Sequence, residues 1–199
     1  NLGTEHPEYI TTLNNVATLY NNTQQYDKAK EIYEQVLKIR EQVLGINHPA
    51  YAFTLSLLGT LYLSTGDYTK AEHYLIQCLE LRKINLTENH PDYADILRQV
   101  ATFYHEIGDD TKALPYYIEN THIRLYQLLN TFSYLSEKEK EKFWSTINND
   151  FHVFNSFAID TYKNNPAIAE KMFNNHLATK GILFNSSYRI RNKILHSKD

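Results

Sequence analysis

The chain has 199 residues, of which 42% are hydrophobic, and a formal net charge of −3. This composition favours a packed core over disorder, and the weak charge gives no reason to expect nucleic acid as a partner. No apolar run approaches the length needed to cross a bilayer and no signal peptide is recognised, so no membrane partner is expected. The single cysteine, Cys78, cannot form an internal disulfide and indicates a reducing, cytoplasmic location.

A His-Pro dipeptide recurs every 42 residues, at His6-Pro7, His48-Pro49 and His90-Pro91. Other positions repeat in register with it, among them Tyr20/Tyr62/Tyr104, Ala17/Gly59/Ala101, Ala29/Ala71/Ala113 and Arg40/Arg82/Arg124. A fixed period of this length predicts stacked supersecondary units. The expected units cover residues 3–44, 45–86 and 87–129, so that the repeats occupy residues 3–129.

Each unit is predicted to be a hairpin of two helices. The first helix begins at the proline, which is tolerated at the first helical position, and its apolar residues follow helical spacing. Gly66-Asp67 and Gly108-Asp109 predict the turn, because glycine ends a helix and aspartate can cap the next. Gln24 replaces that glycine in the first unit, which predicts a less tight turn there. The tyrosine that ends each first helix is expected to fill the space beside the next unit.

These residues carry a resemblance to a known family. The small residue before a tyrosine on the first helix, and the alanine on the second, resemble the tetratricopeptide (TPR) repeat over about residues 3–129. The 42-residue period, with H-P-x-Y and a following G-D-Y, is similar to the repeats of kinesin light chains and many bacterial regulatory proteins. The resemblance implies an all-α fold: a right-handed α-solenoid of three hairpins, followed by about two C-terminal packing or capping helices.

Residues 130–199 are expected to form this C-terminal helical extension. Ser136 and Glu139 predict a capping box at the start of one helix, with Trp144, Ile147, Phe151, Phe154 and Ala158 as its apolar seam. Pro166 is expected to start another helix, with Ala169, Met172, Phe173, His176 and Leu177 on one face. Residues 188–198 form a basic tail, interpreted as the solvated face of a helix whose Ile190, Ile194 and Leu195 are buried. Residues 132–187 resemble the junction between TPR arrays and the caspase-like CHAT domain of bacterial TPR-CHAT proteins, which implies that a CHAT-like domain follows in cis.

No set of residues predicts catalysis, a metal site or a cofactor. Cys78 is the only possible thiol nucleophile, and its position favours a small core residue. His6, His48 and His90 occur once per unit, which spaces them along the array as helix-entry residues instead of gathering them around one ion. The chain also lacks a Gly-rich phosphate loop and a G-x-S-x-G motif. We therefore expect no enzymatic activity, no metal and no cofactor.

The TPR pattern places a peptide-binding groove on the first helices. Its predicted residues are Asn14, Asn15, Thr18 and Asn22, then Ser56, Leu57, Thr60 and Ser64, then Arg98, Gln99, Thr102 and Glu106. TPR domains that clamp a carboxylate use several Lys and Arg, and the matching places here are Asn14, Thr18, Leu57, Asp95 and Gln99. This departure argues against a carboxylate clamp. Side-chain amides at such positions can instead hydrogen-bond a peptide backbone.

The expected function is a non-catalytic scaffold that binds a protein or peptide, as the sensor or regulatory region of a TPR-CHAT protein. A stand-alone adaptor or cargo-binding scaffold similar to kinesin light chain TPRs is the alternative. Self-assembly, including a homodimer, also stays open, because uncovered ends of a solenoid favour association.

Overall fold

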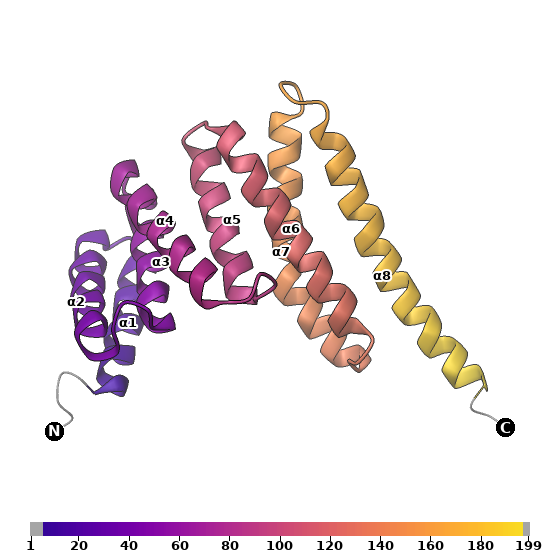
Figure 1. Ribbon diagram of the computed structural model, residues 1–199, viewed down its shortest axis with the longest axis horizontal. Coiled ribbons are helices and arrows are strands. Elements are labelled where there is room, and N and C mark those ends of the chain that lie inside the picture. The colour runs from indigo at the N-terminus through magenta and orange to yellow at the C-terminus, as the bar shows by residue number, and fades with distance from the viewer. Residues whose placement is uncertain (1–5, 197–199) are drawn as a thin grey trace.

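The computed structural model describes the backbone of residues 6–196 and the side chains up to residue 183; that part holds eight α-helices and no strand. Successive helices lie side by side along the long axis of the molecule, from the N-terminus to the C-terminus (Figure 1). The all-α solenoid predicted from the sequence is confirmed. The helices are α1 Pro7–Asn22, α2 Tyr26–Leu44, α3 Pro49–Ser64, α4 Tyr68–Asn85, α5 Pro91–Glu106, α6 Asp110–Phe132, α7 Glu137–Thr161 and α8 Ile168–His196.

The repeated histidines cap the first helix of each hairpin. Nδ1 of His6, His48 and His90 accepts a hydrogen bond from the main-chain N–H two residues later, at 3.3, 3.1 and 3.1 Å. The proline that follows each histidine occupies the first helical turn, where its lack of an N–H costs nothing. The predicted helix-entry role of the His-Pro dipeptide is confirmed, with the imidazole as an N-cap acceptor.

The turn between the helices of a hairpin is the same in all three units. Gly66 and Gly108 adopt φ angles of 80° and 83°, and Gln24 adopts a left-handed φ of 60° at the equivalent place. The turn is closed by main-chain hydrogen bonds from Gln25 N to Tyr20 O at 2.9 Å and from Asp67 N to Tyr62 O at 3.0 Å. The expectation of a less tight first turn is therefore wrong. Gln24 is held in a conformation that costs a non-glycine residue energy.

Small residues allow the two helices of each hairpin to cross closely. Ala17, Ala29, Ala71, Ala101 and Ala113 are fully buried where the helices meet. Gly59 takes this role in α3, where a Cβ atom would lie 2.6 Å from Cγ of Leu75 on α4. At the position equivalent to Leu75, the other two hairpins carry Tyr33 and Tyr117, which are also buried.

Neighbouring hairpins are joined by the second helix of one unit and the first helix of the next. Helix α2 packs on α3, and α4 packs on α5. The hydroxyl of Tyr62 donates to Glu34 of the preceding unit at 2.8 Å, and Tyr104 donates to Glu72 at 2.8 Å. These tyrosines therefore reach back to the preceding unit and not forward to the next. The expectation on this point is wrong, because the first helix turns this face toward the second helix before it.

Helices α7 and α8 continue the array. Glu139 accepts hydrogen bonds from the main-chain N–H of Ser136 at 2.9 Å and from its hydroxyl at 2.6 Å, at the predicted start of α7. The predicted seam packs inward, with Ile147, Phe151, Phe154 and Ala158 buried and Trp144 partly covered. Helix α7 packs on α6, and α8 packs on both.

The structure corrects the predicted face of α8. The helix begins at Ile168, two residues after Pro166. Its covered side carries Ile168, Met172 and Thr179, whereas Phe173 and Leu177 are 59% and 52% exposed. The predicted phase was wrong because α8 meets α6 as well as α7, which rotates its contact face. The side chains of the basic tail lie outside the described residues.

Candidate functional site

Each first helix keeps one stripe open to solvent. On α3 this stripe holds Phe53, Leu57, Thr60 and Ser64, at steps of four, three and four residues. The other sides of α3 are covered by α2, α4 and α5. Equivalent residues on α1 and α5 give four rows across the inner helices: Thr11/Phe53/Asp95, Asn15/Leu57/Gln99, Thr18/Thr60/Thr102 and Asn22/Ser64/Glu106.

Most of the predicted groove residues lie on this open stripe. They are Asn15, Thr18, Asn22, Leu57, Thr60, Ser64, Gln99, Thr102 and Glu106, all partly or fully exposed. Asn14 and Ser56 are the corrections, because they are only 5% and 3% exposed. Their position lies one residue before the stripe, which turns the side chain into the array. Arg98, at the equivalent place on α5, keeps 27% of its side chain exposed.

Sequence reasoning missed the first row of the stripe. Thr11 and Phe53 were not predicted as groove residues, and Asp95 was considered only as a failed clamp position. Phe53 is 45% exposed, although it is a large apolar side chain. The signal available in the sequence was helical spacing, since these residues lie four positions before Asn15, Leu57 and Gln99.

Threonines in the third row are tied to the hairpin core. The hydroxyl of Thr18 donates to Asn14 O at 2.9 Å and lies 2.9 Å from the hydroxyl of Tyr33. Thr102 lies 3.2 Å from the hydroxyl of Tyr117. Burial raises the pKa of both tyrosines above the ordinary value. These threonines therefore have little free hydrogen-bonding capacity, and the ligand-facing chemistry rests on the other rows.

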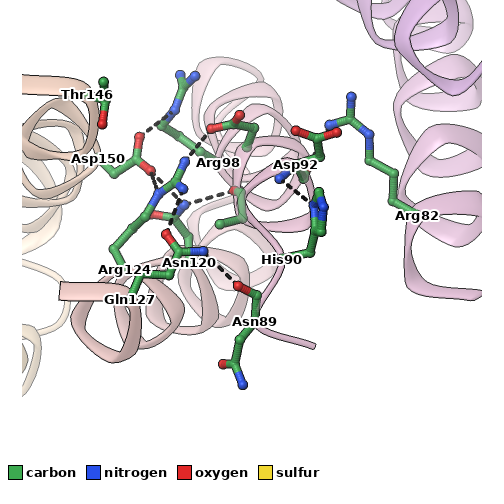
Figure 2. A network of polar contacts seen from close by, with 12 residues as sticks. Arg82, Asn89, His90, Asp92, Arg98, Asn120, Arg124, Gln127, Thr146 and Asp150 are labelled. Atoms are coloured by element: carbon green, nitrogen blue, oxygen red, sulfur yellow. Dashed lines mark hydrogen bonds and ion pairs between the residues drawn. The ribbon is translucent and has the colours of Figure 1, made fainter. Parts of the chain in front are cut away.

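Arg98, the one cation of the predicted groove, is paired within the chain. Its Nε lies 2.8 Å from Oδ1 of Asp150 on α7. Asp150 also accepts a hydrogen bond from Nδ2 of Asn120 at 3.1 Å and an ion-pair hydrogen bond from Nε of Arg124. Figure 2 shows the side chain of Asp150 pointing from α7 toward Arg98 of α5 and toward Asn120 and Arg124 of α6, which together form a buried polar cluster. The pairing leaves the groove without a free cation among the described residues.

The repeated arginine, Arg40, Arg82 and Arg124, connects each second helix to another helix. Arg40 donates to the main-chain oxygen of Ala50 at 2.8 Å, and Arg82 donates to the main-chain oxygen of Asp92 at 2.6 Å. Both bonds therefore reach the first helix of the next unit. Arg124 reaches Asp150 on α7 instead, and Asp95 on its own unit. Arg124 thus contributes to holding α7 against the third hairpin.

Cys78 is a core residue. Its side chain is fully buried, and the thiol donates to the main-chain oxygen of Ala52 at 3.1 Å. Burial raises the pKa of the Cys78 thiol to about 11, against a smaller lowering by Arg82. Asn120 donates from the equivalent position of the third unit to Ala94 O at 2.8 Å. Such a protonated, inaccessible thiol is a poor nucleophile.

In the part of the chain that the structure describes, no three His, Cys, Asp or Glu side chains come together in a way that suits a metal ion. Among the same residues, no helix combines the length and apolar character that a membrane span requires. The open stripe of the first helices is therefore the candidate functional site.

Comparison with known proteins agrees with this architecture. Residues 8–84 and 64–119 match the tetratricopeptide repeat family. A search of curated proteins found no match. Among solved structures, BtubC (BKLC) from P. vanneervenii superposes with a TM-score of 0.60 at 18% identity, over 87% of this chain and 65% of that one. The chain therefore spans slightly less than two thirds of that protein.

A second similar structure is the crystal structure of nearly identical TPR-like repeats from a Podosopora anserina protein assigned as a kinesin light chain. It gives a TM-score of 0.57 at 16% identity, over 97% of this chain and 98% of that one. A variant of the same protein gives the same score and identity, with 100% of both chains covered. At these identities the likeness concerns the fold alone.

Proposed function

Because the chain belongs to the tetratricopeptide repeat family, we propose that it is a non-catalytic scaffold that binds a protein or peptide on the open stripe of α1, α3 and α5. The observation that carries this proposal is the stripe itself. The second helices and α7 cover other sides of α3 and α5, so the stripe is the side of these helices that stays accessible along the array. Repeat arrays of this type present extended surfaces to partners.

The chemistry of the stripe suits a polypeptide ligand. Asn15, Asn22 and Gln99 offer amide groups, which can both donate to and accept from a peptide backbone. Phe53 and Leu57 provide apolar contact in the middle unit. Together these groups support binding through a backbone and one or more apolar side chains.

The test is partner binding by stripe variants of the full-length protein. We expect Asn15→Ala and Gln99→Ala together to weaken a partner that co-purifies with the protein. Substitution of Ile84, which is 78% exposed on the second helix α4, should leave the partner bound. Equal loss on both surfaces would contradict the proposed groove.

A finer proposal concerns the whole protein. Residues 132–187 resemble the TPR-to-CHAT junction, and we propose that partner binding acts through α7 and α8 on a CHAT-like protease domain in the cytoplasm. The contacts of Asp150 with α5 and α6 support this, because they connect both helices of the third hairpin to α7. If partner binding left the protease activity of the full-length protein unchanged, the regulatory role would fail.

A stand-alone adaptor or self-assembling scaffold is the alternative. The similarity in fold to kinesin-light-chain-type repeats favours it. The two proposals differ in the chain that follows: an adaptor needs no caspase-like domain with a His and a Cys. Light scattering of the full-length protein would separate a self-assembling scaffold from a monomeric adaptor.

A further inference from the structure

We infer that the open stripe selects a segment in which a bulky apolar side chain is flanked by lysine or arginine. This inference rests on the proposed peptide-binding function and names the chemistry of its ligand. Three observations carry it: an apolar pair formed by the exposed Phe53 and the half-buried Leu57, a predominance of carboxylates on the inner helices, and the internal pairing of the one inner cation.

The apolar pair lies in the middle of the array. Phe53 and Leu57 are one helical turn apart on α3, so their side chains are neighbours on the stripe. Phe53 is 45% exposed, whereas Leu55 and Leu58 on the same helix are fully buried. The corresponding places on α1 are Thr11 and Asn15, and on α5 they are Asp95 and Gln99. The middle unit therefore offers an apolar contact that its neighbours lack.

Charge is unevenly distributed over the inner helices. Helix α1 carries one carboxylate, Glu8, and α3 carries no charged side chain. Helix α5 carries Asp92, Asp95 and Glu106 against the single guanidinium of Arg98. Asp95 pairs with Arg124 of α6, so Asp92 and Glu106 are the carboxylates of α5 without a cationic partner among the described residues. A surface with this balance attracts cations and repels carboxylates.

The pairing of Arg98 strengthens this preference. Asp150 of α7 contacts Nε of Arg98 at 2.8 Å, which offsets the positive charge of this guanidinium from inside the array, although 27% of the side chain is exposed. Glu106, in contrast, is exposed and has no cationic partner among the described residues. A ligand that crosses from α3 to α5 meets the apolar pair first and carboxylates next, which fits an apolar residue with basic neighbours.

The test is a selection of random short peptides, displayed on phage, against the full chain. We expect the enriched peptides to share a bulky apolar residue with Lys or Arg close to it. Phe53→Ser should raise the Kd of such a peptide by on the order of tenfold, as loss of a central apolar contact does. Ile84→Ser, the matched change on the exposed side of α4, should leave the Kd unchanged, and circular dichroism melting establishes that both variants fold.

A separate variant, Glu106→Gln, tests the inferred preference for basic peptides. Glu106→Gln should weaken the Lys- or Arg-containing peptide about two- to fivefold and reduce the dependence of its Kd on salt, because one attractive charge is lost. Asp95 is kept unchanged, since it pairs with Arg124. Leu57→Ser provides a second apolar test if Phe53→Ser lowers the melting temperature.

The outcomes separate the inference from the function on which it rests. Enriched peptides that are acidic, yet lose affinity in Phe53→Ser, would overturn the inferred ligand chemistry and leave the groove intact. Enriched peptides whose Kd is the same for the wild type, Phe53→Ser and Leu57→Ser, or an absence of any enriched peptide, would overturn the proposed peptide-binding function itself. Basic-apolar peptides that depend on Phe53 and Glu106 would support both.

Discussion

Replacement of Asp150 by alanine should release α7 from the array. The Asp150 side chain is 4% exposed and contacts Arg98, Arg124 and Asn120. Its removal leaves the buried guanidinium of Arg124 with Asp95 as its remaining carboxylate partner, and Arg98 without one. Truncation of one partner of a buried ion pair costs about 3–5 kcal/mol, because the other charge stays buried and unpaired. Because Arg124 keeps Asp95 and Arg98 is 27% exposed, we expect Asp150→Ala to lower the free energy of undocking α7 by about 3 kcal/mol, the lower end of this range.

The only tryptophan of the chain reports on this event directly. Trp144 lies on α7, with its ring centroid 5.9 Å from that of Phe151 in a stacked arrangement. Urea titrations followed by tryptophan fluorescence should show an earlier transition for Asp150→Ala, while circular dichroism retains much of the helical signal of α1–α6. Separate transitions by fluorescence and by circular dichroism are consistent with the expected result, since repeat arrays need not unfold in one step.

Asp160→Ala is the matched control on the same helix. The Asp160 side chain is 59% exposed, and its ion-pair contact with His105 spans 3.7 Å. Exposed pairs of this kind contribute about 0–1 kcal/mol, so the fluorescence midpoint should hardly move. Equal midpoints for Asp150→Ala and Asp160→Ala would refute the reasoning, because they would mean that the buried cluster does not hold α7.

Three further predictions concern the hairpins. Gln24→Gly should raise the free energy of unfolding by about 0.5–1 kcal/mol by relieving the left-handed glutamine; an unchanged urea midpoint would contradict this. Gly59→Ala should lower the free energy of unfolding by about 1–3 kcal/mol, because the added methyl group collides with Leu75. Leu75→Ala in the same chain should relieve part of that loss. Strictly additive effects of the two substitutions would argue against the close crossing of α3 and α4. Cys78→Val, which copies Val36 of the first unit, should make the free energy of unfolding less sensitive to alkali. In the wild type the raised pKa of the Cys78 thiol stabilises the folded state below pH 9. This contribution, on the order of 2 kcal/mol, is lost between pH 9 and 11. Parallel pH profiles for the two proteins would contradict the assignment.

The helices and their order were predictable because they follow from local chemistry. The recurring His-Pro dipeptide, the Gly-Asp turns and the Ser136–Glu139 pair each specify a helix end within a few residues of sequence. Gln24 shows the limit of such reasoning. Packing of the hairpin on both sides of the turn imposes the left-handed conformation, whether or not the residue favours it.

The candidate site was predictable in its helices and in most of its residues, but not in its full extent. A helix turns each residue by about 100° from the last, so Asn14 and Ser56, one residue before the stripe, lie inside the array. Phe53 lies one helical turn before Leu57 and was not included in the predicted set. Three contacting neighbours decide which side of α3 stays open, and those contacts are not written in α3 alone.

The role of Asp150 could not be predicted from the sequence for a related reason. It lies next to Phe151 in the apolar seam of α7, and its partners Arg98 and Arg124 are far away along the chain. Only the docking of α7 beside α5 and α6 brings these charges together. The repeat of Arg40, Arg82 and Arg124 was visible, but its function as a contact to the next unit required the hairpins to be stacked.

The most direct test of the account is to ask which surface of the full-length protein touches its partner. A photo-crosslinking amino acid placed at Leu57, on the stripe of α3, should form a covalent adduct with a bound protein or peptide. The same amino acid at Ile84, on the exposed side of α4, should form none. Adducts from position 84 and none from position 57 would contradict the claim that the open stripe of the first helices is the binding surface.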